Sequence, residues 1–274
     1  MPVTRLLVEG ELDAQLLAPL FAGNPVVEAI KSSKNALAPR TRTERQKAGP
    51  CVSYLRDRDF DYDPLDQLDQ PTIDKAENGI VLGWRWSRHS IENYMLEPAI
   101  ACTALAVDEA TYQTALSIAG SKIKYYQAAR WAIGIARSAL PPYYELRTQP
   151  DGANEFYLPG DDGLTDDTAK NWALDHVEAF ANRVRPKLEA NAIAESYDKY
   201  SGFFNHEESV PVETILVYFS GKDLMTALDP FWRPLGILGA NDFRGRIRDW
   251  MRAHPDEVRV ALPEWQALLD TVRG

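Results

Sequence analysis

The sequence predicts an α/β fold, in which an open parallel sheet flanked by helices is followed by a mostly helical C-terminal region. Two observations carry this prediction. Up to Pro98, short apolar runs alternate with amphipathic stretches, which is the pattern of β-α-β units. Beyond Pro98 the chain is rich in Ala, Leu, Ile and Tyr at helical spacing. With 274 residues, 45% of them hydrophobic, the chain can form one large domain or two modest ones.

The first elements are expected in the order β-α-β-α-β. They are a strand over 3–9, a helix over 11–22, a strand over 26–30, a polar helix over 33–48 interrupted at Pro39, and a strand over 51–57. The strands are short apolar runs, and the first helix gathers its leucines on one face. Breaks come from Gly23-Asn24-Pro25 and from Gly49-Pro50. Such an order predicts parallel strands joined by right-handed crossovers.

The later elements are expected to be mainly helical. An acidic loop with Pro64 and Pro71 precedes a fourth apolar strand at 80–86, and Ser87 is expected to cap a helix that begins near Ile91. Further helices are expected over 99–140, from Thr165 onward after a loop at 143–165, over 243–253 and over 263–272, whereas 212–219 fits either a strand or a helix. The simplest division is a core over 1–98 and a mostly helical region over 99–274 that completes or flanks it.

Composition narrows the class of protein. The net charge of -10 and the pI near 5.0 argue against a protein that coats nucleic acid through bulk positive charge, but they allow local binding through a metal and a basic strip. Cys51 and Cys102 lie in apolar segments and are expected to be small buried residues rather than a disulfide or thiolate metal ligands. We find no apolar run of about 18 residues and no signal peptide, so we expect a cytoplasmic protein without a membrane span.

Acidic residues follow two of the expected strands. Glu9 ends the first apolar run, and Asp57, Asp59 and Asp61 follow the run that ends at Leu55. Open α/β sheets bind their ligands at the carboxyl ends of parallel strands, so both sets are expected at one edge. Gathered carboxylates repel one another unless a cation joins them. The arrangement therefore predicts a divalent metal site at this edge, and two carboxylates at the spacing of Asp57 and Asp59 suit Mg²⁺ or Mn²⁺.

Each acidic motif also has a structural interpretation. In Glu9-Gly10-Glu11-Leu12-Asp13, Gly10 permits a tight turn from strand to helix, and the helix dipole alone explains Asp13. In the run from Asp57 to Asp63, alternate side chains of an extended chain share a face and Phe60 can pack beneath them, whereas the alternative is a solvated acidic loop. A calcium loop of the EF-hand kind is disfavoured, because its Gly at the sixth position and its closing Glu are absent.

The segment from Trp84 to Tyr94 joins a strand end to a helix start, which is a common anion site. Arg88 and His89 are candidates to bind a phosphate, and His89 is also a candidate to transfer a proton. Glu92 and Asn93 are expected to face the metal. The alternative is a surface turn that buries the two tryptophans of the segment.

One basic strip interrupts this acidic chain. It consists of Lys31, Lys34, Arg40, Arg42, Arg45 and Lys47. Arg42 and Arg45 in particular are expected to pair with phosphates beside a scissile bond, and a solvated helix face is the alternative. The run Ser220-Gly221-Lys222-Asp223 lacks the earlier Gly and the following Ser or Thr of a P-loop, so no ATP site is expected there.

Together and in this order, these motifs resemble those of the TOPRIM superfamily, which includes the catalytic domains of topoisomerases and primases and the OLD-family nucleases. The matching residues are Val8-Glu9-Gly10 and the Asp-x-Asp of Asp57-Arg58-Asp59. The segments 90–96 and 218–224 are similar to a bacterial group encoded beside ABC-type ATPases in antiviral defence, of which the nuclease subunits of PARIS systems are an example. The resemblance covers residues 3–97 well and the remainder loosely.

The resemblance implies a metal-dependent nuclease that cleaves RNA, including transfer RNA, or DNA. Glu9 would act as the general acid/base or as a metal ligand, Asp57 and Asp59 would hold the metal, and Glu92 would be an accessory acidic residue. The resemblance also implies a toxic effector that an ATPase partner restrains. It leaves open whether the chain forms a homo-oligomer. We identify no topoisomerase-type tyrosine region and no primase zinc module, which argues against those two activities.

Two other functions are compatible with the same residues. One is a non-catalytic interaction subunit that docks a partner through the same crevice, which predicts no dependence on Mg²⁺. The other is a phosphotransfer or nucleotide-binding domain, which predicts binding of small nucleotides and indifference to polynucleotides. Metal dependence and the choice of ligand therefore discriminate the three functions.

Overall fold

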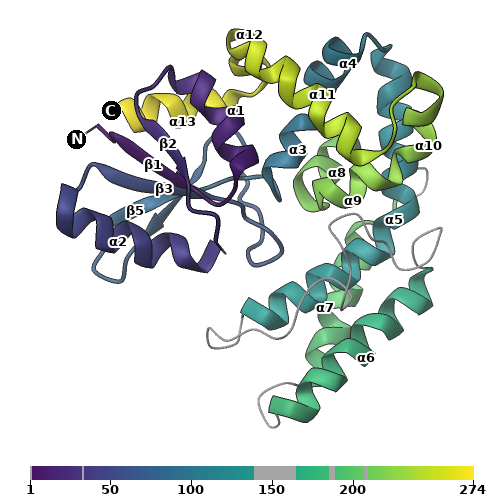
Figure 1. The fold of residues 1–274 in the computed structure, drawn as a ribbon. Helices are drawn as coiled ribbons and strands as arrows, with labels where there is room; N and C mark the ends of the chain where they lie inside the picture. The colour runs from purple at the N-terminus through teal and green to yellow at the C-terminus, as the bar shows by residue number, and fades with distance from the viewer. Residues whose placement is uncertain (1, 33, 139–164, 185–188, 207–208) are drawn as a thin grey trace. The chain divides into compact units, whose positions relative to one another are not determined.

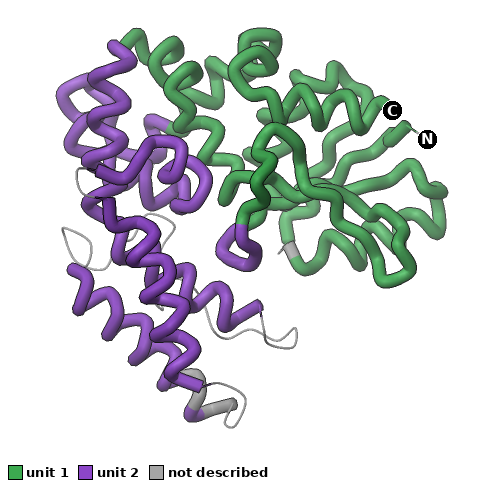
Figure 2. The backbone as a smooth tube through the Cα atoms, turned by 180° about the vertical axis from the view of Figure 1, so that it is seen from behind, with its two compact units in different colours: residues 1–58, 64–107, 244–274 green, residues 59–63, 108–243 purple. Residues whose placement is uncertain are grey.

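The computed structural model describes residues 2–32, 34–138, 165–184, 189–206 and 209–274, which form two compact units (Figure 2). The first unit comprises the described residues of 1–58, 64–107 and 244–274, and the second those of 59–63 and 108–243. The region after residue 98 was expected to complete or flank the core, and in the structure its C-terminal segment, 244–274, belongs to the first unit. The chain passes from one unit to the other directly after Arg58.

Within the described residues, the sheet of the first unit has five strands in the order β2-β1-β3-β5-β4 (Figure 1). They are β1 (Arg5–Val8), β2 (Val26–Ala29), β3 (Val52–Arg56), β4 (Thr72–Lys75) and β5 (Val81–Arg85). β1 pairs in parallel with β2 and β3, and β3 pairs in parallel with β5, which confirms the predicted parallel sheet. β4 is an antiparallel edge strand, and it lies in the segment that was expected to be an acidic loop. The sequence does not predict this strand, because Thr-Ile-Asp-Lys is too polar.

An apolar core lies between the sheet and α2 (Leu37–Ala48). Leu37 of this helix packs with side chains of the three central strands, which are Leu7, Val52, Tyr54 and Leu82. Figure 1 shows α1 (Glu11–Phe21) and α13 (Pro263–Arg273) on the other face of the sheet. Full burial of an aliphatic side chain contributes about 1.5–3 kcal/mol, so apolar packing on both faces stabilises the sheet.

The remaining helices of the first unit are short, apart from α11. They are the 3₁₀ turn η1 (Lys34–Ala36), α3 (Ile91–Met95), α4 (Pro98–Leu105), α12 (Pro255–Ala261) and α11 (Ala240–Ala253), which enters the unit at Arg244. The helices expected over 243–253 and 263–272 are therefore confirmed as α11 and α13. The N–H of Val3 donates to the carbonyl of Val272 at 3.0 Å, which joins the end of α13 to the N-terminal segment.

The second unit is helical in all its described elements. They are α5 (Glu109–Ser138), α6 (Asp166–Val184), α7 (Ala190–Phe203), α8 (Val212–Tyr218), α9 (Gly221–Ala227), α10 (Asp229–Trp232) and the 3₁₀ turn η2 (Arg233–Leu235). Residues 212–219 thus contribute a helix and no strand, and the expected loop at 143–165 lies almost wholly outside the described residues. Trp131 of α5 stacks on Tyr200 of α7, with 4.7 Å between ring centroids. No helix in the described part of the chain is long and apolar enough to cross a membrane.

Candidate functional site

Glu9 lies directly after β1, at the turn into α1. The N–H of Gly10 donates to the Asp13 carboxylate at 3.2 Å, so Asp13 satisfies one of the backbone donors at the start of the helix. A Cβ on residue 10 would lie only 3.3 Å from that carboxylate oxygen, which explains why glycine suits the turn. Asp13 is accordingly a buried structural residue, and Glu9 is left at the carboxyl end of the strand.

Glu9 and Asp57 come together at the ends of neighbouring strands. The N–H of Asp57 donates to Oε1 of Glu9 at 3.3 Å, and the strands that lead to these two residues are paired in parallel. Oδ1 of Asp57 in turn accepts from the N–H of Ile91, the first residue of α3, at 3.1 Å. Two hydrogen bonds therefore connect Glu9, Asp57 and the start of α3 at the ligand-binding edge of a parallel sheet.

Glu92 follows Ile91 in the first turn of α3 and is buried, with 3% of its surface exposed. Its carboxylate lies 3.8 Å from the guanidinium of Arg244, which comes from α11. The structure thus brings the predicted accessory acid next to the Asp57 contact, together with an arginine that no sequence motif marks.

Ser90, and not Ser87, stands at the start of α3. The N–H and the hydroxyl of Ser90 donate to Oδ1 of Asn93, at 3.1 and 3.0 Å. Ser87 donates instead through its N–H and its hydroxyl to the Glu264 carboxylate, at 2.7 and 2.5 Å. The predicted Ser87 cap is wrong because α3 begins at Ile91, so Ser90 and not Ser87 is the residue directly before the helix. The hydrogen bonds from Ser90 also give Asn93 a structural role in closing the turn.

Asp59 belongs to the second unit, although only Arg58 separates it from Asp57. Its φ of 53° lies in the left-handed region, so the chain turns at this residue. The expectation that the aspartates of this run share one face of an extended chain is therefore wrong. Asp59 remains the predicted third acidic residue of the site.

The segment 59–63, here called the acidic loop, is held by helices of its own unit. Phe60 is 1% exposed and meets the ring of Trp131 edge-on, with 5.3 Å between centroids. The ion pairs of the loop are Asp61–Arg137 and Asp63–Lys199. An aromatic anchor and ion pairs to α5 and α7 thus distinguish this segment from a solvated acidic loop.

The carboxylates of Glu9 and Asp57 are the candidate metal ligands of the first unit. Across the residues that the structure describes, no group of three or more His, Cys, Asp or Glu side chains could hold a metal ion. Mg²⁺ is commonly bound through one or two carboxylates, with water and substrate phosphates completing its octahedron. Two carboxylates at neighbouring strand ends, connected by the hydrogen bond from the backbone N–H of Asp57 to Glu9, suit that mode of binding. They do not suit the four-ligand structural site typical of zinc.

Arg88 and His89, expected to bind phosphate, are engaged within the fold. Arg88 donates to the Asn93 carbonyl at 3.2 Å and to the Glu97 carboxylate at 2.6 Å, and its guanidinium lies 4.9 Å from the centroid of the Tyr94 ring. His89 is only 4% exposed. These contacts fix the loop between β5 and α3, so the structure does not support a phosphate contact by either residue.

Arg45 is a structural residue of α2. Its guanidinium donates to the carbonyls of Val52 at 2.6 Å and Val81 at 2.8 Å, and to the hydroxyl of Ser53 at 3.0 Å. Burial lowers the pKa of Arg45, and an arginine nevertheless stays protonated in proteins. The structure does not support substrate binding by Arg45, because its guanidinium donors bind β3 and the backbone of β5. Arg42 of the same helix is exposed and remains a candidate.

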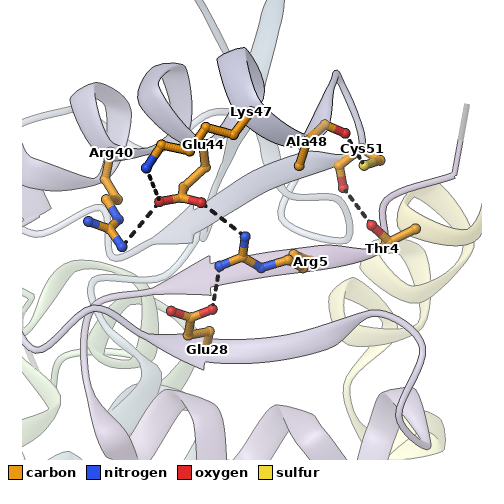
Figure 3. A network of polar contacts seen from close by, with 8 residues as sticks. All are labelled: Thr4, Arg5, Glu28, Arg40, Glu44, Lys47, Ala48 and Cys51. Carbon is orange, nitrogen blue, oxygen red and sulfur yellow. Dashed lines mark hydrogen bonds and ion pairs between the residues drawn. The ribbon is translucent and has the colours of Figure 1, made fainter.

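The surface around α2 is a network of ion pairs (Figure 3). Glu44 accepts from Arg5 at 3.1 Å, and the cations of Arg40 and Lys47 lie 3.1 and 4.0 Å from its carboxylate. Arg5 also pairs with Glu28 at 2.6 Å. The hydrogen bond from Arg5 lowers the pKa of Glu44, and the bonds to Glu28 and Glu44 raise the pKa of Arg5. Two residues of the predicted basic strip, Arg40 and Lys47, therefore share one carboxylate with Arg5.

Glu264 is a buried acid that no sequence motif marks. It lies in the first turn of α13, is 2% exposed, and accepts hydrogen bonds from Ser87 and from the hydroxyl of Tyr94. Burial raises the pKa of Glu264, and the hydrogen bonds from Ser87 and Tyr94 oppose that rise. Its partner Ser87 is 177 positions away in the chain, so only the folded structure reveals the contact.

Comparison with known proteins assigns no family to the chain. No protein-family model matches it, and no curated protein matches it. Any assignment of function therefore depends on the geometry described above and on the motifs of the sequence.

Proposed function

We propose that this chain is a metal-dependent nuclease of the TOPRIM kind, with its catalytic centre at Glu9 and Asp57. The proposal is carried by the meeting of these residues at the carboxyl ends of adjacent parallel strands, where the Asp57 N–H binds the Glu9 carboxylate. Open α/β sheets bind their ligands at this edge. A carboxylate from each of two adjacent strand ends at this edge suits a hard divalent cation, which would offset the repulsion between like charges.

The proposed cofactor is Mg²⁺ or Mn²⁺, held by Glu9 and Asp57. When bound, such an ion activates water and offsets the charge that develops on a phosphodiester. Glu9 acts as the general base that accepts a proton from the attacking water. The N–H of Ile91 orients the Asp57 carboxylate at the strand end.

The proposed substrate is RNA, including transfer RNA, or DNA. A net charge of -10 disfavours indiscriminate binding of polyanions, which is consistent with a selective enzyme. The proposal therefore includes a toxic effector of antiviral defence in the cytoplasm, restrained by an ABC-type ATPase partner. Glu92 serves in it as an accessory acidic residue next to the Asp57 contact.

Incubation of the purified chain with total RNA and with plasmid DNA, with and without Mg²⁺, tests the proposal. Cleavage is expected only with the ion. Glu9→Gln is expected to lower the rate by about 10²–10⁴-fold, the usual contribution of general acid–base catalysis. Asp57→Asn is expected to lower the rate as well, because it removes a charged ligand of the ion. Glu11→Gln is the matched control, because Glu11 is an exposed carboxylate close in sequence that pairs with Lys31. Cleavage without metal, or full activity of Glu9→Gln, would contradict the mechanism.

A non-catalytic interaction subunit is the second candidate function. It is favoured by one observation, namely that the described residues contain no group of three or more side chains able to hold a metal. This candidate predicts no Mg²⁺ binding by calorimetry and no loss of biological effect in Asp57→Ala. Binding of Mg²⁺ that Asp57→Ala removes would exclude it.

A further inference from the structure

Helix α11 carries a row of arginines along one side. Its buried side chains include Phe243, Ile247 and Met251. Each of these is followed by an arginine, and the three residues Arg244, Arg248 and Arg252 are here called the arginine row. Residues four apart are neighbours on a helix surface, and a rise of about 1.5 Å per residue separates them by about 6 Å along the axis. The row is therefore a regular line of positive charge.

The arginine row begins beside the proposed catalytic centre. Arg244 lies 3.8 Å from Glu92, and Glu92 follows Ile91, whose N–H binds Asp57. From Arg244 the row leads along α11 to Arg252, which is exposed. A polyanion with one phosphate at the centre would therefore meet further cations at regular intervals along this helix.

Within the arginine row, Arg248 is held by a weak ion pair. It pairs with its neighbour Asp249 at 2.8 Å, and 34% and 62% of the two side chains are exposed. Exposed pairs of this kind contribute little to stability, so a phosphate can replace the aspartate at little cost. On α2, by contrast, Arg40 and Lys47 share the carboxylate of Glu44, whose side chain is only 10% exposed.

We propose that α11 is the nucleic-acid docking surface of this chain, on which the arginine row binds successive phosphates of the backbone. The inference rests on the proposed function, because a polynucleotide is the substrate of that centre. A chain with a net charge of -10 needs a local cationic surface to hold a polyanion. Contacts to phosphates position a strand without reading its sequence, so RNA and DNA are both expected to dock here.

Fluorescence anisotropy with labelled single-stranded RNA and DNA oligonucleotides tests this surface. The full chain carries Glu9→Gln, which keeps the oligonucleotide intact, and Arg248→Ala and Arg252→Ala are added together. Each phosphate contact contributes about 0.7 to the slope of log K against log salt for a single strand. The double variant is expected to bind about tenfold more weakly and to lower the magnitude of this slope by about 1.4.

Lys75→Ala combined with Arg259→Ala is the matched control. Both residues lie in the first unit, and the change removes the same charge. Arg259, like Arg248, pairs with an aspartate on its own helix. Replacement of Arg248 and Arg252 by Lys keeps the charge and is expected to retain most of the affinity, which separates phosphate binding from a folding defect.

Equal weakening in the α11 variant and in the control would overturn the inference, because it would reflect bulk charge alone. Unchanged affinity of the α11 variant for the oligonucleotides would overturn the inference as well. The arginine row would then be a surface for an acidic protein instead. Failure of the proposed function is distinguishable from both. If the oligonucleotide binds through the arginine row but the unmutated chain does not cleave it, the proposed nuclease activity is contradicted and the proposed docking surface is retained.

Discussion

At the scale of single residues, Glu264 makes the stability of the first unit depend on pH. Burial raises the pKa of its carboxyl above the ordinary value of 4.5 in the folded chain, where it faces Ser87, Tyr94 and the charge of Arg88. Between the ordinary pKa and the raised one, the folded state keeps a proton that the unfolded state has lost. This contribution to stability is fully present below the ordinary pKa and is lost as the pH rises through the raised one.

Glu264→Gln removes this titration and keeps the size of the side chain and one acceptor oxygen, which can still accept from the N–H of Ser87. The free energy of unfolding of the variant, relative to wild type, is expected to increase as the pH rises from 4.5 through the raised pKa. Urea denaturation at a series of pH values measures this difference, with Glu257→Gln on the exposed side of α12 as the control. A difference that does not change with pH would show that Glu264 titrates normally.

Residues differ in how far the sequence predicts their roles. The placement of Glu9 and Asp57 is predictable, because local apolar runs locate the strand ends and parallel pairing brings neighbouring ends together. The role of Arg45 is not predictable, since an arginine on a polar helix gives the same pattern whether it reaches solvent or the Val52 carbonyl. Glu264 is hidden for a similar reason, because its partners are far away in the chain.

At the scale of elements, α5 and the acidic loop pack closely together. Gly134 of α5 makes this approach feasible, because a Cβ at this position would lie 2.4 Å from both Cβ and the carbonyl oxygen of Phe60. The guanidinium of Arg130 lies 4.5 Å from the centroid of the Phe60 ring and also pairs with the buried Asp223. The loop therefore rests on a surface of α5 that is shaped for it.

Gly134→Ala is expected to lower the free energy of unfolding by about 1–3 kcal/mol, the usual cost of overpacking, despite the higher helix propensity of Ala. Gly202→Ala is the control in the same unit, because no atom lies within 4 Å of a Cβ built there. A stabilisation of about 0.5–1 kcal/mol is expected for that control. Chemical denaturation followed by circular dichroism measures both, and an unchanged Gly134→Ala would contradict the tight contact with Phe60.

The type of most elements follows from their sequences, and the exceptions have physical causes. The parallel strands are predictable because strands buried on both faces are nearly continuous apolar runs. β4 is not predictable from its sequence. It is an edge strand whose Ile73 is half exposed, so it can form without the apolar run that marks a buried strand. The apolar run at 212–219 becomes helix α8, and periodicity alone does not separate these outcomes in so short a run.

At the scale of the whole molecule, the first unit is assembled from three separate stretches of chain. Composition changes near residue 98, and this change predicts a boundary there. Composition does not show that the C-terminal helix α13 belongs to the first unit, because this depends on which face of α13 is buried. That face consists of Trp265, Leu268, Leu269 and Val272.

Truncation after His254 is therefore expected to unfold the first unit. Loss of four buried apolar side chains, at about 1.5 kcal/mol or more each, is comparable with the whole stability of a typical domain, about 5–15 kcal/mol. Amide chemical-shift dispersion in NMR spectra measures the outcome, with removal of Gly274 alone as the control. A truncated chain that keeps the dispersed spectrum of its sheet would contradict this account.

The hydrogen bond between Val3 and Val272 also determines how the molecule transmits mechanical force. Because both of these residues belong to the first unit, tension applied near residues 3 and 272 loads that unit directly. The stretch 108–243 lies between the loaded segments, so it carries tension only after the first unit has opened. Pulling on the molecule would thus dismantle the proposed centre first, before the helices of the second unit extend.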